Sequence, residues 1–176
     1  MLTSEILSKL DNAIQQLFDN DMNILTRGLN ELNINGHLTR YLTLLFSGNN
    51  VDPEYNGDIS KTHDRKEIAI AGRRLIEIGR KISKNNLYRL TPDIIIHTRN
   101  TNDNNLLVLE IKKDSNSRDE KDFDLLKLEH MTIDYSGNHY NFQVGAALIF
   151  GTKANAGQLE IIYYQNGIPT LRENLI

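Results

Sequence analysis

Two apolar stretches on either side of a polar loop decide the expected fold: TPDIIIHT at residues 91–98 and LLVLEIKK at residues 106–113. Runs of aliphatic and β-branched residues of this length are typical of strands. The segment between them, RNTNDNN at residues 99–105, is short, polar and rich in Asn. The pattern therefore predicts a hairpin whose two strands cover residues 93–98 and 106–113.

Three ionisable residues of this hairpin are expected to converge. Side chains two positions apart on a strand share a face, so Glu110 and Lys112 project together. Asp93 opens the partner strand. A turn centred near residues 102–103 would place Asp93 opposite Lys112 and diagonal to Glu110, within the reach of cross-strand pairs. Two carboxylates and one amine would then lie side by side.

The rest of the chain predicts alternating helices and strands around the hairpin. Apolar residues at three- and four-residue intervals predict helices at 4–20, 30–46, 64–83 and 119–132. Apolar runs predict further strands at 51–56, 142–150 and 159–165. Short strands flanked by helices are typical of an α/β fold with a mixed central sheet. No Pro-, Gly- or Ser-rich linker divides the sequence, so a single domain over residues 1–176 is expected.

Composition narrows the class of protein. Hydrophobic residues make up 39% and charged residues 24%, which is typical of a globular chain rather than a disordered one. The absence of Cys excludes disulfides, thiolate metal sites and a Cys nucleophile, and it fits the reducing cytoplasm, where we expect the protein to reside. No apolar stretch is long enough for a membrane span, so no membrane association is expected.

The net charge of −3 hides an uneven distribution. Residues 61–89 carry nine basic and three acidic side chains, a net charge of +6, which leaves −9 on the rest of the chain. On the predicted helix 64–83, Arg73, Arg80 and Lys84 fall on one flank. This stripe is a candidate contact for the phosphate backbone of a nucleic acid. The alternative is a solvated helix face that is basic for solubility alone.

The convergent acids and amine point to phosphodiester chemistry. Two nearby carboxylates need a cation between them, and oxygen ligands with free positions suit Mg²⁺ or Mn²⁺. The amine of Lys112 could orient or deprotonate an attacking water while the metal stabilises charge on the phosphorus. Alternatively, Glu110 and Lys112 form the solvated face of a half-exposed strand. The acid-x-Lys pattern occurs three times in the chain, but only here within an apolar strand.

A further acid, Glu31, lies near the start of the predicted helix 30–46, on the same inward stripe as Ile34. A carboxylate aimed at the interior needs a partner, whether a cation, a metal or amide donors. The alternative role of an acid at this position is to complement the helix dipole.

The strand motifs resemble the signature of the PD-(D/E)XK nuclease superfamily, whose fold resembles that of restriction endonucleases. Pro92-Asp93 opens one strand, and Glu110-Ile111-Lys112 lies in the next. The resemblance, to small prokaryotic members in particular, implies an αβββαβ core with a mixed central sheet flanked by helices. This chain would add an N-terminal helix and an inserted basic helix to that core.

The resemblance also assigns roles to individual residues. It implies Asp93 and Glu110 as metal ligands, Lys112 as the catalytic lysine and Glu31 as a third metal-binding acid. Lys127, on the helix that follows the motif strand, matches a position where some members place a polar residue that contacts the substrate. A solvent-facing Lys127 with no such role is the alternative.

The expected function is therefore Mg²⁺- or Mn²⁺-dependent hydrolysis of phosphodiester bonds in nucleic acid, with DNA favoured over RNA. Members of this superfamily often act in restriction or phage defence, and restriction-like nucleases often form homodimers to cut two strands. Some members have lost catalysis, so the alternative is an inactive module that binds nucleic acid or a protein partner. A third possibility is a structural α/β protein in which these residues form surface ion pairs.

Overall fold

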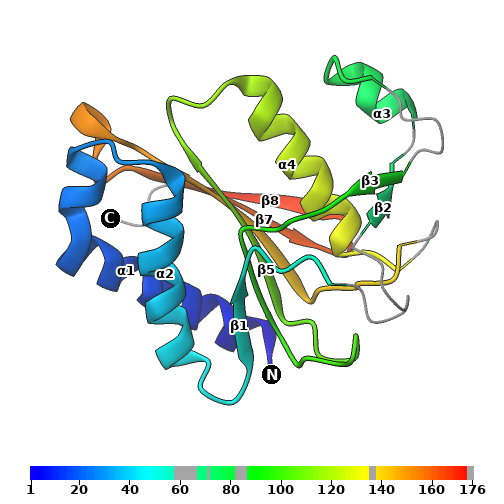
Figure 1. The fold of residues 1–176 in the computed structure, drawn as a ribbon, viewed down its shortest axis with the longest axis horizontal. Helices are drawn as coiled ribbons and strands as arrows, with labels where there is room; N and C mark the ends of the chain where they lie inside the picture. Colours follow the sequence, from blue (N-terminus) through cyan, green and yellow to red (C-terminus); the bar gives the residue numbers. More distant parts are fainter. Residues whose placement is uncertain (58–66, 71, 82–86, 135–137, 174–176) are drawn as a thin grey trace.

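The structure is a computed structural model, and it describes residues 1–57, 67–70, 72–81, 87–134 and 138–173 (Figure 1). The helices are α1 (Thr3–Thr26), α2 (Glu31–Leu45), α3 (Gly72–Glu77) and α4 (Arg118–Met131), with a 3₁₀ turn η1 (Lys153–Asn155). The strands are β1 (Asn50–Pro53), β2 (Glu67–Ala69), β3 (Leu87–Arg89), β4 (Ile94–His97), β5 (Leu107–Lys113), β6 (Val144–Phe150), β7 (Leu159–Gln165) and β8 (Ile168–Glu173). The protein is thus an α/β protein, as the sequence predicts.

Six of these strands form one open, mixed sheet in the order β1-β4-β5-β6-β7-β8. Strands β5 and β6 pair in parallel, and all other neighbours in this sheet are antiparallel. A parallel pair needs a crossover connection, and α4 supplies it between β5 and β6. Strands β2 and β3 pair separately as a small antiparallel ribbon.

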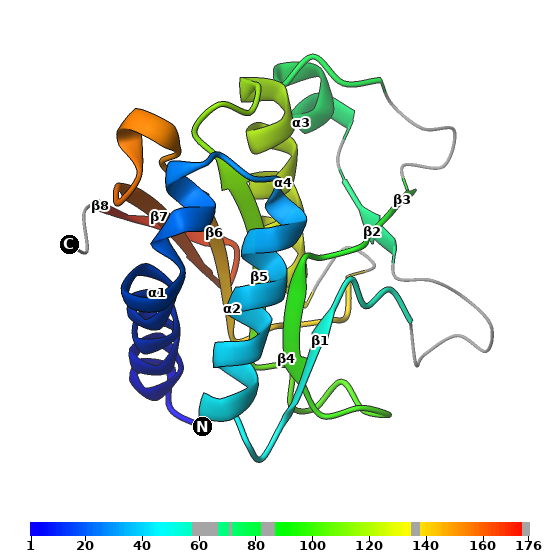
Figure 2. The same cartoon turned by 60° about the vertical axis from the view of Figure 1, so that its left-hand side comes forward.

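Helices cover both faces of the large sheet. Helices α1 and α2 lie on one face, and α4 lies on the other (Figures 1 and 2). Alternation along the central strands explains this arrangement, because Leu107, Leu109 and Ile111 join the core under α1 and α2. Val108 and Ile95 point the opposite way, into a second core with α4. Glu110 and Lys112 therefore project towards the α4 side of the sheet.

Two helix starts are fixed by side-chain caps close to the residues of interest. The side chain of Asn30 accepts a hydrogen bond from the backbone N–H of Asn33, so α2 begins at Glu31. Helix α4 begins with a capping box, in which Ser117 and Glu120 each bind the other's backbone N–H. These caps set where along each helix the later polar residues face the sheet.

The predicted long helix over residues 64–83 is wrong in extent, because only α3 is helical among the described residues of this range. Within this range the described residues form β2 and the short helix α3, while residues 64–66, 71, 82 and 83 lie outside the described part of the chain, and β3 follows at Leu87. Ile68 and Ile70 alternate into the core, which is a strand period. Gly79 has φ +72° and ends α3 in a Schellman pattern, with Gly79 N–H bound to Ile76 O and Arg80 N–H to Leu75 O.

None of the described helices is both long and apolar enough to cross a lipid bilayer.

The turn after β6 depends on the absence of a side chain at Gly151. A Cβ there would lie 2.2 Å from the backbone oxygen of Asn155, well inside contact distance. We expect Gly151→Ala to lower the free energy of unfolding by about 2 kcal/mol, measured by urea denaturation, because the backbone must move to relieve the clash. Gly48→Ala is the matched control, since a Cβ there meets nothing within 4 Å. Equal stability of the two variants would contradict this prediction.

Candidate active site

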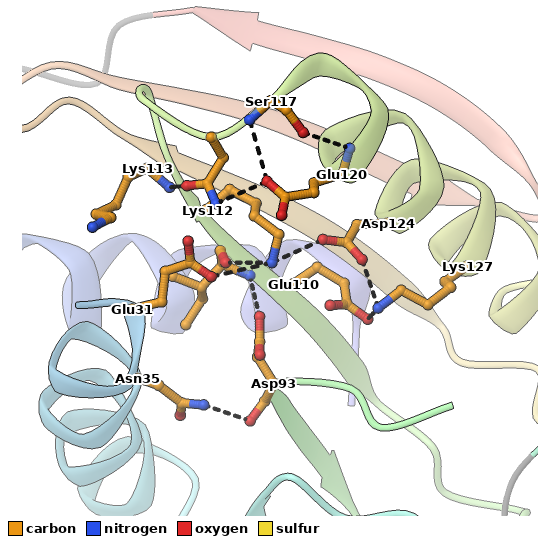
Figure 3. Close-up of polar contacts among 12 residues, drawn as sticks. Glu31, Asn35, Asp93, Glu110, Lys112, Lys113, Ser117, Glu120, Asp124 and Lys127 are labelled. Carbon is orange, nitrogen blue, oxygen red and sulfur yellow. Dashed lines mark hydrogen bonds and ion pairs between the residues drawn. The ribbon is translucent and has the colours of Figure 1, made fainter. Parts of the chain in front are cut away.

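The predicted acids and amine of the hairpin do converge, at the end of β5 on the face covered by α4 (Figure 3). The register differs from the prediction, however. Ile94 pairs with Leu109, and continuing this register places Asp93 level with Glu110 rather than with Lys112. The loop is thus centred one residue earlier than expected.

Asp93 is held from two sides. Its Oδ2 accepts a hydrogen bond of 2.6 Å from the backbone N–H of Ile111, and its backbone oxygen accepts one of 3.0 Å from Nδ2 of Asn35. The carboxylate therefore takes part in fixing the strand that carries Glu110 and Lys112. Burial raises the pKa of Asp93, against the opposing effects of the Ile111 N–H and the Lys112 charge.

Glu110 is almost completely enclosed, with 2% of its surface exposed. Its Oε1 lies 2.7 Å from Nζ of Lys127 in an ion pair. Burial, with repulsion from Asp124 and Asp93, raises the pKa of Glu110 well above its usual value, although Lys127 opposes this rise. Any cation that approaches this carboxylate therefore stabilises its ionised form.

The Lys112 ammonium lies among oxygen atoms. Its Nζ is 3.0 Å from Oδ2 of Asp124, 3.3 Å from Oε2 of Glu31 and 3.2 Å from the backbone oxygen of Ile111. Burial alone would lower the pKa of Lys112, but the negative charges of Asp124, Asp93 and Glu31 outweigh it and raise that pKa. The side chain is therefore a positive charge at neutral pH and not a free base.

Helix α4 contributes two further residues. Lys127, predicted as a nucleic-acid contact, is only 8% exposed, and its Nζ lies 2.6 Å from Oδ1 of Asp124. The solvent-facing alternative for Lys127 is therefore wrong. Asp124 was not predicted from the sequence. A signal was present, because Asp124 and Lys127 share the inward stripe of α4 with the buried Leu128 and Met131.

Glu31 reaches the cluster from α2 and meets Lys112 there. Asn35, one turn further along the same face of α2, binds Asp93 and was also missed. The first turn of α2 is thus joined to the site by two polar contacts. The inward orientation predicted for Glu31 is confirmed, and its partner is an ammonium.

The ion pairs link five residues into a line of alternating charge: Glu110, Lys127, Asp124, Lys112 and Glu31 (Figure 3). With Asp93, the cluster holds four carboxylates and two ammonium groups, a formal charge of −2 when all are ionised. Within the described residues, no three acidic or His side chains stand together as a ready-made metal cluster. The two lysine ammonium groups lie between the acids, which explains why the acidic side chains stand apart from one another.

The cluster borders a surface groove of about 450 Å³ between the first turns of α2 and α4. Its lining residues are Asn30, Glu31, Leu32, Lys113, Ser115, Asn116, Ser117 and Glu120. Glu31 belongs to both the groove and the ion-pair line, so the groove gives the cluster an approach from solvent.

The basic stripe does not join the cluster directly. Arg73 is exposed on α3, and Lys84 lies outside the described residues. The guanidinium of Arg80 stacks 4.0 Å from the centroid of the Phe123 ring, and the same ring lies 5.9 Å from Nζ of Lys127. Arg80 is therefore separated from the ion-pair line by one aromatic side chain.

Comparison with protein-family models, with curated proteins and with solved structures finds no match to this chain.

Proposed function

We propose that this protein is a Mg²⁺-dependent nuclease with a restriction endonuclease-like fold of the PD-(D/E)XK type. The order of elements supports the proposal. Omitting α1 and the insertion β2-α3-β3, the chain from Glu31 to Phe150 runs α2, β1, β4, β5, α4, β6, which is the αβββαβ order of that superfamily. Helix α1 is then the additional N-terminal helix, and the insertion replaces the inserted basic helix that the sequence predicted.

The observation that carries the proposal is the charge of the buried cluster. When all six groups are ionised, four carboxylates and two ammonium groups leave an excess of −2, which one divalent cation would neutralise. Carboxylate oxygens are the ligands that Mg²⁺ prefers, so the donor set fits this ion. Asp93 and Glu110 would hold it, with Glu31 as a third acid. When bound, Mg²⁺ would polarise the phosphodiester and lower the pKa of an attacking water.

The positive charge of Lys112 suits the reaction. Hydrolysis of a phosphodiester builds negative charge on the oxygens around the phosphorus, and a fixed cation in a low-dielectric site stabilises that charge strongly. Asp124 and Glu31 orient the ammonium for this role. Since Lys112 is protonated in the cluster, electrostatic stabilisation is favoured over proton abstraction.

The same arrangement supports a nucleic acid as the substrate. The groove reaches the cluster at Glu31, and the exposed Arg73 and Arg80, which lie outside the groove lining, would contact phosphates of a polymer bound there. We propose DNA ahead of RNA, cleaved by a homodimer if both strands are cut. A role in restriction or phage defence is part of the proposal and rests on the sequence resemblance alone.

One observation favours a second candidate, a catalytically inactive module on the same fold that binds nucleic acid or a protein. The two lysines already pair with Glu110, Asp124 and Glu31, and no ready-made metal cluster is present among the described residues. Such a module would bind DNA without cutting it, whether or not Mg²⁺ is added.

A cleavage assay with supercoiled plasmid, single-stranded DNA and RNA separates the two candidates. We expect the parent protein to cut DNA with Mg²⁺ and not with EDTA. Lys112→Met should lower the rate by about 10²-fold, because it removes the cation beside the phosphate. Lys121→Met is the matched control, since Lys121 does not line the groove and its Nζ binds the backbone oxygen of Asp114 at 2.8 Å instead of the acids. DNA binding without Mg²⁺-dependent cleavage would favour the inactive module.

A further inference from the structure

The contact between Lys127 and Glu110 is the most enclosed ion pair of the cluster. The two side chains are 10% and 2% exposed, and 2.7 Å separates Nζ from Oε1. In the proposed reaction, however, Glu110 is a metal ligand. The ammonium group therefore lies on a carboxylate that a divalent cation would need.

We propose that Lys127 is a built-in counter-ion that competes with the divalent cation for Glu110. This inference rests on the proposed function. It assigns Lys127 a regulatory role at the site in place of direct contact with nucleic acid. Two cations that share one buried carboxylate repel each other, so entry of the divalent ion requires the ammonium to move away from Oε1.

Asp124 provides the position to which the ammonium can withdraw. Its Oδ1 lies 2.6 Å from Nζ of Lys127, closer than Oε1 of Glu110. The ammonium can therefore leave Glu110 and keep an acidic partner, which avoids the large cost of an unpaired buried charge. The flexible four-carbon stem of Lys allows this shift without movement of α4.

The competition lowers the apparent affinity for the divalent cation. When only a fraction of molecules has Glu110 free, the apparent dissociation constant rises by the inverse of that fraction. If about one molecule in ten is free, removing the ammonium should tighten binding about tenfold. A lysine that merely stabilised the site would have the opposite effect, because its loss would loosen the cluster.

Calorimetric titration of the full chain with Mn²⁺ tests this directly. Lys127→Met and Lys127→Gln are expected to bind Mn²⁺ about tenfold more tightly than the parent. The Gln variant retains a donor for Glu110 and so guards against a folding defect in the Met variant. Lys121→Met is the matched control on the same helix, since its Nζ binds the backbone oxygen of Asp114 at 2.8 Å. It should bind Mn²⁺ as the parent does.

A second measurement uses the unmodified protein. Titration with Mg²⁺ should shift the side-chain ammonium ¹⁵N resonance of Lys127 and leave that of Lys121 unchanged. Folded Lys127 variants that bind Mn²⁺ no more tightly than the parent would overturn the inference. A Lys127 resonance that does not shift when Mg²⁺ binds would also overturn it.

These outcomes also separate the inference from the proposed function. Tighter Mn²⁺ binding by the variants, with no cleavage of any nucleic acid by the parent, would support the competition and refute the nuclease. Mn²⁺-dependent cleavage with unchanged affinity in the variants would support the nuclease and refute the competition. If neither the parent nor the variants bind Mn²⁺, both fail.

Discussion

Glu110→Gln is expected to abolish Mn²⁺ binding and to lower DNA cleavage by about 10³-fold or more, while the protein stays folded. The amide has the shape of the carboxylate but lacks the charge that a divalent cation requires. The fold should survive because Lys127 keeps its contact with Asp124, 2.6 Å away. Calorimetry with Mn²⁺, plasmid cleavage and thermal unfolding measure the three effects separately.

Glu120→Gln is the matched control for this change. Glu120 lines the groove beside the cluster, but its carboxylate belongs to the capping box of α4, where Gln is equally suitable. The control should bind Mn²⁺ and cleave DNA as the parent does. Cleavage by Glu110→Gln at the parent rate would exclude Glu110 from the active site, and with it the proposed mechanism.

The hairpin and the sheet around it could be predicted because their apolar runs are long and their neighbours are clear. The register of the two hairpin strands was harder to predict. The register depends on the conformation of the loop at residues 99–105, and this Asn-rich sequence is compatible with several turn types. An error of one residue in the turn centre moved Asp93 from the level of Lys112 to that of Glu110.

The largest error in the fold prediction concerned residues 64–83. Ile68, Leu75 and Ile78 fit a helical period, but Ile68 and Ile70 also fit a strand period, and a three-residue strand leaves little local signal. Strand β8 was missed as well. The turn residues Asn166 and Gly167 both have positive φ and are typical of a tight hairpin, whereas Pro169 within the following segment argues against a strand.

The site residues that belong to the strand motifs were the easiest to predict. Glu110 and Lys112 lie in β5 and Asp93 immediately precedes β4, so strand alternation indicates where they point. Asp124 lies on a helix and carries no motif, so only its place on an apolar stripe marked it. Charged residues on such a stripe are predicted to need partners, but the sequence does not show which strand residues lie opposite.

Asp124→Ala is expected to lower the free energy of unfolding by about 3 kcal/mol, which corresponds to roughly 6–12 °C in Tm for a chain of this size. Asp124 is 8% exposed on its side chain and contacts both ammonium groups, Lys112 at 3.0 Å and Lys127 at 2.6 Å. Its removal leaves two enclosed positive charges that share their remaining acids. The loss should therefore exceed that of an ordinary surface ion pair.

Asp122→Ala provides the comparison on the same helix. Asp122 pairs with Arg118 at 3.5 Å, but the Arg118 side chain is 91% exposed, so this pair is screened by solvent. Its loss should cost no more than about 0.5 kcal/mol. Differential scanning calorimetry of both variants, without divalent ions, measures the difference. Equal Tm values would mean that solvent, and not Asp124, stabilises the two lysines; the ion-pair line would then have no structural role.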